Sequence, residues 1–204
     1  LKILSKNNNS KLLKNFNNEV EVQLKDVITK SQIPLKNFNL LGKIEKGKFT
    51  KISAKSEFSK DKYFDVSLTK DSNNKKILEV YSDLPQALLA DYKFFEGIKG
   101  GKLLYSSLIS ESGSNSKLVI ENFKVKKAPA FATLLTLADL SGIADLLLGQ
   151  GMSFDILEIN FKDDDNVTVV EEILALGSSV SLHMDGYIEK KNRFTELKRN
   201  NGSG

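Results

Sequence analysis

The feature that most constrains the fold of this chain is a two-residue alternation of apolar and polar side chains. It is clearest in two segments, whose apolar members are Phe64, Val66 and Leu68 in one and Val180, Leu182 and Met184 in the other. Successive side chains of a β-strand point to opposite faces of its sheet. The alternation therefore predicts half-buried strands with one face toward water.

Turn-forming residues separate the alternating segments at 45–48, 70–74, 111–115 and 163–166. This regular spacing predicts an elongated, twisted antiparallel sheet whose single apolar face forms a groove. Residues 1–19 are rich in Asn and Lys and are expected to form an irregular start. Residues 20–198 are expected to form one elongated module, and residues 199–204 a linker-like tail.

Two stretches interrupt the strands with helical patterns. Pro129 suits a first helical turn, and the apolar residues that follow recur at helical spacing, so a helix pair is predicted over 129–148. A further helix is predicted to be capped by Asp83 and to end near Gly97. The expected fold is therefore mainly β with a few short helices.

Composition argues against several classes of function. The 30 basic and 26 acidic residues are interspersed, and Arg193 and Arg199 are the two arginines, which disfavours nucleic-acid recognition. The absence of Cys excludes disulfides and thiolate chemistry. No apolar run reaches the roughly 18 residues that would span a bilayer. The chain does not begin with Met, so we expect a fragment whose membrane anchors lie outside it.

Catalytic motifs are not found in the sequence. His183 is the one histidine, and it is expected on the polar face of a strand, without a nucleophile motif nearby. The acidic run 163–165 lacks the glycine and the ligand spacing of a calcium loop, and is expected to form a hairpin turn. We therefore expect a protein that is not an enzyme and that holds neither a metal nor a cofactor.

Residues 77–198 resemble the AsmA-like C-terminal domain family of Gram-negative envelope proteins, which is related to the bridge-like lipid transfer proteins. The stretches that carry the resemblance are 77–83, 95–103, 118–125, 128–130, 134–135, 140–143, 147–154, 175–179 and 185–188. The most specific is the helix pair followed by Gly-Gln-Gly-Met-Ser-Phe. Family members continue past the last strand into a Gly-Val-Val-Pro-type segment, whereas here a polar tail follows, as truncation would produce.

The resemblance implies a periplasmic body anchored to the inner membrane by a segment not present here. It also implies that the body binds or conducts phospholipid along an apolar groove for outer-membrane lipid homeostasis. The expected lipid-contacting residues are Phe64, Val66, Leu68, Phe131, Leu134, Leu135, Val180, Leu182 and Met184. Each of them fits an ordinary protein core equally well.

Two other interpretations remain open at this point. The domain fits a periplasmic scaffold or outer-membrane protein assembly factor that binds an envelope protein by adding a strand at an open sheet edge. A carbohydrate-binding β module is the third, although Trp is absent and the five Tyr are scattered.

Overall fold

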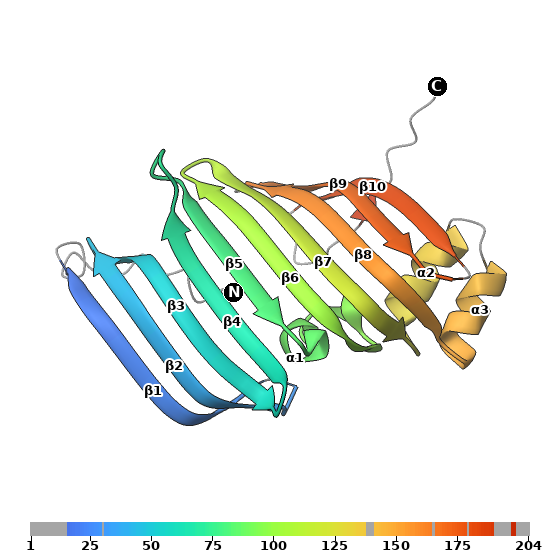
Figure 1. Ribbon diagram of the computed structural model, residues 1–204. Helices are drawn as coiled ribbons and strands as arrows, with labels where there is room; N and C mark the ends of the chain where they lie inside the picture. Colours follow the sequence, from blue (N-terminus) through green and yellow to red (C-terminus); the bar gives the residue numbers. More distant parts are fainter. Residues whose placement is uncertain are drawn as a thin grey trace.

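The strands of this protein form one open antiparallel sheet in which each strand pairs with its neighbours in sequence (Figure 1). The computed structural model describes residues 16–29, 31–137, 141–164, 166–178, 180–189 and 197–198. This part of the chain holds eleven strands. They are β1 (Asn18–Ile28), β2 (Pro34–Glu45), β3 (Lys48–Ser59), β4 (Lys62–Lys70), β5 (Lys76–Ser82), β6 (Ile98–Ser110), β7 (Gly113–Val125), β8 (Met152–Asp163), β9 (Val167–Leu176), β10 (Ser181–Glu189) and β11 (Leu197–Lys198).

The predicted fold class, mainly β with an antiparallel sheet and short helices, is confirmed. Each predicted turn joins two neighbouring strands of the sheet. The acidic turn is an example, because the Asp164 carboxylate accepts hydrogen bonds from the amides of Asn166 and Val167 at 2.7 and 2.8 Å. Strands β1 to β4 continue directly into the remainder of the sheet, so residues 18–70 share it with residues 76–189.

The predicted helix pair is also confirmed, as α2 (Pro129–Leu137) and α3 (Ser141–Gly149). Figure 1 places both helices at the end of the sheet where β7 ends and β8 begins. The helix predicted between Asp83 and Gly97 is much shorter than expected. It comprises α1 (Pro85–Leu89) and a separate 3₁₀ turn (Lys93–Phe95), because the backbone at Tyr92 is extended between them.

The prediction that Asp83 caps α1 is wrong. The helix begins after Leu84, and no side chain caps it. The Asp83 side chain is 5% exposed, and its carboxylate accepts hydrogen bonds from the Tyr63 amide at 2.9 Å and the Tyr81 hydroxyl at 2.6 Å. Asp83 therefore fastens the end of β5 to the start of β4.

These hydrogen bonds shift two pKa values in opposite directions. Burial acts to raise the pKa of Asp83, but the hydrogen bonds from Tyr81 and the Tyr63 amide outweigh it and hold the pKa below the ordinary 3.8. The hydrogen bond to Asp83, together with burial, raises the pKa of Tyr81 to about 12. The ionised carboxylate is therefore the form that the folded protein favours.

We expect Asp83→Ala to lower the free energy of unfolding at neutral pH by about 2 kcal/mol, because two part-buried donors lose a charged acceptor. The depressed pKa means that this contribution is complete above the ordinary pKa of 3.8 and is lost as the pH falls through the lower folded value. Urea unfolding at several pH values tests this. The gap between wild type and variant should be constant above about pH 5 and shrink in stronger acid. A gap that persists unchanged below pH 3, or an equal loss in the exposed control Asp155→Ala, would contradict the assignment.

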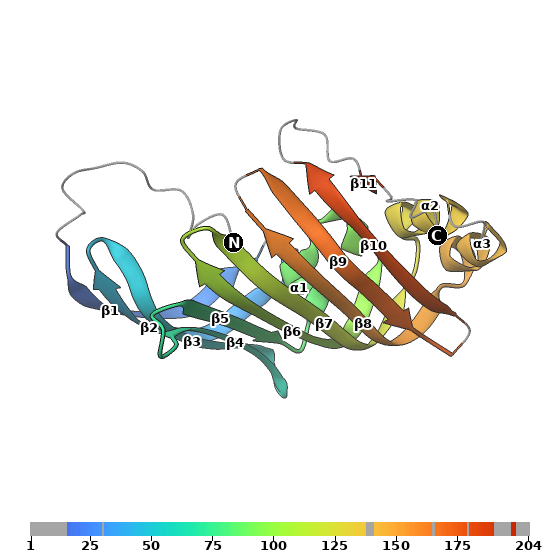
Figure 2. The same ribbon diagram turned by 90° about the horizontal axis from the view of Figure 1, so that it is seen from above.

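The sheet is curved, and α1 lies inside the curve (Figure 2). We call the side that carries α1 the inner face and the opposite side the outer face. The inner face holds one extended hydrophobic core, in which Leu103, Ile120 and Leu157 are 2%, 0% and 3% exposed. These three residues lie directly opposite one another on β6, β7 and β8. A second, smaller cluster of Leu35, Phe58 and Ala87 packs α1 against the ends of β2 and β3.

Candidate functional site

The strand register places apolar side chains of the inner face in rows that run across the sheet. One row crosses from β1 to β10, with each member directly opposite the next. Its members are Val22, Leu40, Ala54, Val66, Val80, Tyr105, Leu118, Ile159, Ile173 and Met184. The inner face is therefore largely apolar from β1 to β10, as the alternation in the sequence predicts.

The inner face is unevenly covered. In β5 to β9 most of its apolar residues are buried. In β1 to β4 many are half-buried or exposed, and Leu24 is 46% exposed. We call this group the apolar patch, which consists of Val20, Val22, Leu24, Phe38, Leu40, Phe49, Phe64 and Val66. A large apolar patch left accessible on one face marks a site for binding lipid or protein.

The helices explain the difference in cover. Ala132 and Leu135 of α2 and Ala144 of α3 join the core around Phe123 and Phe154, whose rings stack with centroids 5.3 Å apart. This closes the end of the inner face beside α2 and α3. The short α1 contacts β6 and packs near Phe64, and most of the patch lies beyond its reach.

The predicted lipid-contacting residues occupy three separate places. Phe64 and Val66 of β4 belong to the apolar patch, and Leu68 is buried beside them. Val180 and Met184 are half-buried and Leu182 is buried at the opposite edge of the sheet, next to β9. Leu135 is buried within the helix pair.

The sheet therefore connects the β4 and β10 groups through its rows but does not bring them into direct contact. Phe131 and Leu134 lie in α2, and their side chains are outside the described residues.

A small polar group interrupts the apolar inner face. Ser116 donates a hydrogen bond to Ser107 at 2.9 Å, and the Tyr105 hydroxyl lies 3.2 Å from the Ser116 hydroxyl. Ser107 and Ser116 are buried on β6 and β7. The three hydroxyls satisfy one another, so this group needs no ligand to complete its hydrogen bonding.

The outer face carries charged side chains and several ion pairs, together with the exposed Leu41 and Leu104. The Lys117 ammonium lies 2.6 Å from the Glu158 carboxylate. The hydrogen bond from Lys117, followed by that from Asn160, holds the pKa of Glu158 below its usual value. His183 lies 3.2 Å from Glu172, and its side chain is 69% exposed, which confirms its predicted surface position.

Two other hollows are present in the surface. One, of about 510 Å³, is lined mainly by outer-face residues of β3 to β7, including Lys55, Asp65 and Glu79. The other, of about 340 Å³, lies among the hairpin turns near Ser112 and Asp163. Both hollows mix polar and apolar residues, and the larger one includes Leu104 and Val119 beside its charged side chains. The patch is the more extended apolar surface, so it is the stronger candidate site.

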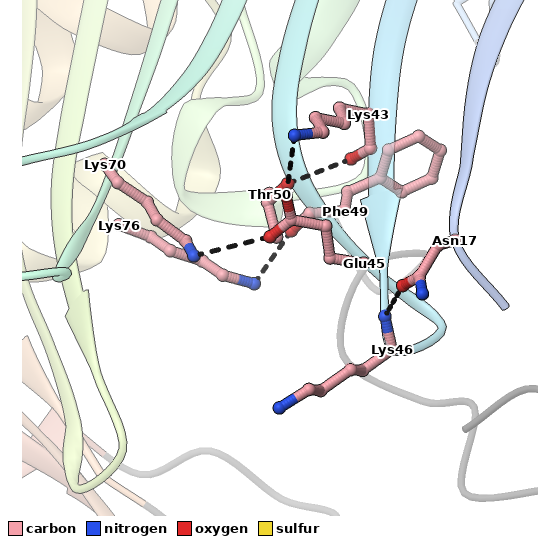
Figure 3. Close-up of polar contacts among 8 residues, drawn as sticks. All are labelled: Asn17, Lys43, Glu45, Lys46, Phe49, Thr50, Lys70 and Lys76. Carbon is pink, nitrogen blue, oxygen red and sulfur yellow. Dashed lines mark hydrogen bonds and ion pairs between the residues drawn. The ribbon is translucent and has the colours of Figure 1, made fainter. Parts of the chain in front are cut away.

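Lysines gather where the apolar patch meets the end of the sheet (Figure 3). Lys70 and Lys76 lie directly opposite each other on β4 and β5, next to the row that contains Leu68. The Lys76 ammonium donates to the Phe49 carbonyl at 2.9 Å. Glu45 binds Lys43 at 2.8 Å and reaches Lys70 only at 3.9 Å.

Positive charge exceeds negative charge in this group. Figure 3 shows the side chains of Lys43, Lys70 and Lys76 near the single carboxylate of Glu45, whereas the Lys46 side chain points away from it. Partial burial, with the charges of Lys48 and Lys70, lowers the pKa of Lys76. We call Lys70 and Lys76 the basic rim. The basic rim was not predicted from the sequence, although a turn at 70–74 between two strands was a signal that these lysines face each other.

Among the described residues, no group of three or more His, Cys, Asp or Glu side chains is placed to hold a metal ion. No helix within the described ranges has the length and apolar character needed to cross a bilayer. Comparison with protein-family models, with curated proteins and with solved structures finds no match to this chain.

Proposed function

We propose that this chain binds phospholipid on the inner face of its sheet, with the acyl chains on the apolar patch, as part of lipid handling in a bacterial envelope. The observation that carries the proposal is the patch itself. It is an apolar surface on β1 to β4 that α1, α2 and α3 leave largely open, beside a closed core in the same sheet. The resemblance of residues 77–198 to AsmA-like proteins favours lipid over other apolar ligands.

The energetics of the patch suit a ligand that is held but can move. Removing an acyl chain from water stabilises the complex by about 0.8 kcal/mol for each buried methylene. The patch side chains Val22, Leu40 and Val66 carry no hydrogen-bonding groups that would fix one position along the sheet. These three residues belong to one row, so a chain could shift along it from strand to strand with little change in contact, as conduction along a sheet requires.

A scaffold that binds an envelope protein is the second candidate, and one observation favours it. Among the described residues, β1 pairs with β2 on one side only, which leaves an eleven-residue edge strand. Such an edge can accept a strand from a partner protein. This interpretation predicts a stable protein without lipid.

A charge placed on the patch tests the lipid proposal. Val66 is half-buried on the inner face, whereas Thr69, on the same strand, is exposed on the outer face. We expect Val66→Asp to weaken binding of a fluorescent phospholipid about tenfold or more, because a carboxylate would be desolvated beneath the acyl chains. Thr69→Asp adds the same charge and should bind like wild type.

Two results would count against lipid binding on the patch. One is a folded wild-type chain that takes up no phospholipid, which would favour the scaffold. The other is equal binding by wild type and Val66→Asp when circular dichroism shows both to be folded.

A further inference from the structure

The basic rim lies at one end of the apolar patch, within the span of a single lipid molecule. Lys70 follows Val66 by four residues on β4, a separation of roughly 14 Å along an extended strand. Leu68, between them, faces the same side and is buried. An acyl chain lying over Phe64 and Val66 would therefore end beside Lys70 and Lys76.

The charges of the rim are arranged in a way that favours an anion. Like charges directly opposite each other on neighbouring strands destabilise a sheet, and Lys70 and Lys76 are such a pair. The hydrogen-bond acceptor of Lys76 is a neutral carbonyl, that of Phe49. Glu45 is closer to Lys43 than to Lys70, at 2.8 Å against 3.9 Å, so it compensates the rim weakly.

We propose that the basic rim, Lys70 and Lys76, binds the phosphate of a phospholipid whose acyl chains lie on the apolar patch. This inference rests on the proposed function and deepens it, because it fixes the orientation of the lipid and its headgroup class. Two ammonium groups can both donate to the oxygens of one phosphate, and the phosphate would relieve their mutual repulsion. The headgroup would then lie at the β4–β5 hairpin, with the acyl chains pointing toward the opposite end of these strands.

The test compares two lipids that share their acyl chains and differ in the phosphate. Binding of phosphatidic acid and of diacylglycerol is measured for wild type, for the double variant Lys70→Gln/Lys76→Gln, and for Lys51→Gln/Lys55→Gln. The last pair lies on exposed positions of β3 and changes the net charge equally. The affinity of wild type for phosphatidic acid should exceed its affinity for diacylglycerol by about fivefold for each rim lysine. The rim variant should lose this preference, and the β3 variant should keep it.

The outcomes separate the two proposals. Equal wild-type binding of both lipids would overturn the rim proposal and leave lipid binding intact, whereas binding of neither lipid would overturn both. If the rim variant does not fold, the wild-type preference is measured at rising salt concentration. It should shrink as salt screens the lysines, and a preference independent of salt would contradict the rim proposal.

Discussion

Ile120→Ala is expected to lower the free energy of unfolding by about 3–4 kcal/mol, the effect of a large truncation in a closed core. Ile120 is fully buried on the central strand β7, between Leu103 and Leu157, and each of these neighbours is also buried. A cavity there cannot be filled by solvent or by collapse of a surface loop. Urea unfolding monitored by circular dichroism measures the change.

The neighbouring residue provides a matched control. Val119 lies on the same strand but faces the outer side and is half-buried. Val119→Ala should therefore lower the free energy of unfolding by less than about 1 kcal/mol. Equal losses in the two variants would show that the inner face at β7 is not the closed core described here. A loss of lipid binding by Ile120→Ala under folded conditions would likewise show that the site extends beyond the patch.

Gly97→Ala is expected to lower the free energy of unfolding by about 3 kcal/mol, because backbone strain and a steric clash combine. Gly97 has a φ of +84°, and a Cβ there would lie 2.1 Å from the Lys126 carbonyl oxygen. That contact would also disturb the hydrogen bond from the Lys126 amide to the Gly97 carbonyl, which is 3.0 Å long. This bond closes the chain just before α2, so the loss should be greatest around the helix pair.

Gly100 separates the two penalties. Its φ is +68°, but a Cβ there would meet nothing within 4 Å. Gly100→Ala should therefore show the backbone strain alone, about 1 kcal/mol. Thermal and urea unfolding of both variants measures the difference, and hydrogen exchange locates it. Similar losses for the two glycines would contradict the close approach of Lys126 to Gly97.

The strands and their faces could be predicted from the sequence because they depend on local alternation. The segment around Phe64 to Leu68 encodes which side chains share a face, and the turns on either side encode an antiparallel neighbour. The helix pair was predictable for the same reason, from Pro129 and the helical spacing that follows. Both signals are complete within one short stretch of chain.

Features that depend on distant residues could not be predicted in this way. Asp83 looked like a helix cap because one of its two hydrogen-bond partners, the Tyr63 amide, is twenty residues away on another strand. The other partner, Tyr81, is close in sequence. The uneven cover of the inner face was also hidden, because Val66 and Leu182 have the same local pattern and differ in burial. That difference comes from the curvature of the sheet and the positions of the helices.

The central claim, that acyl chains lie on the apolar patch, is tested most directly by photo-crosslinking. Wild-type chain is incubated with a phospholipid that carries a photoreactive group in its acyl chain, and the attached residues are identified by mass spectrometry. Adducts should concentrate on inner-face residues of β1 to β4, such as Val22, Leu40 and Val66. Adducts confined to the outer face, or a folded chain that acquires none, would contradict the account.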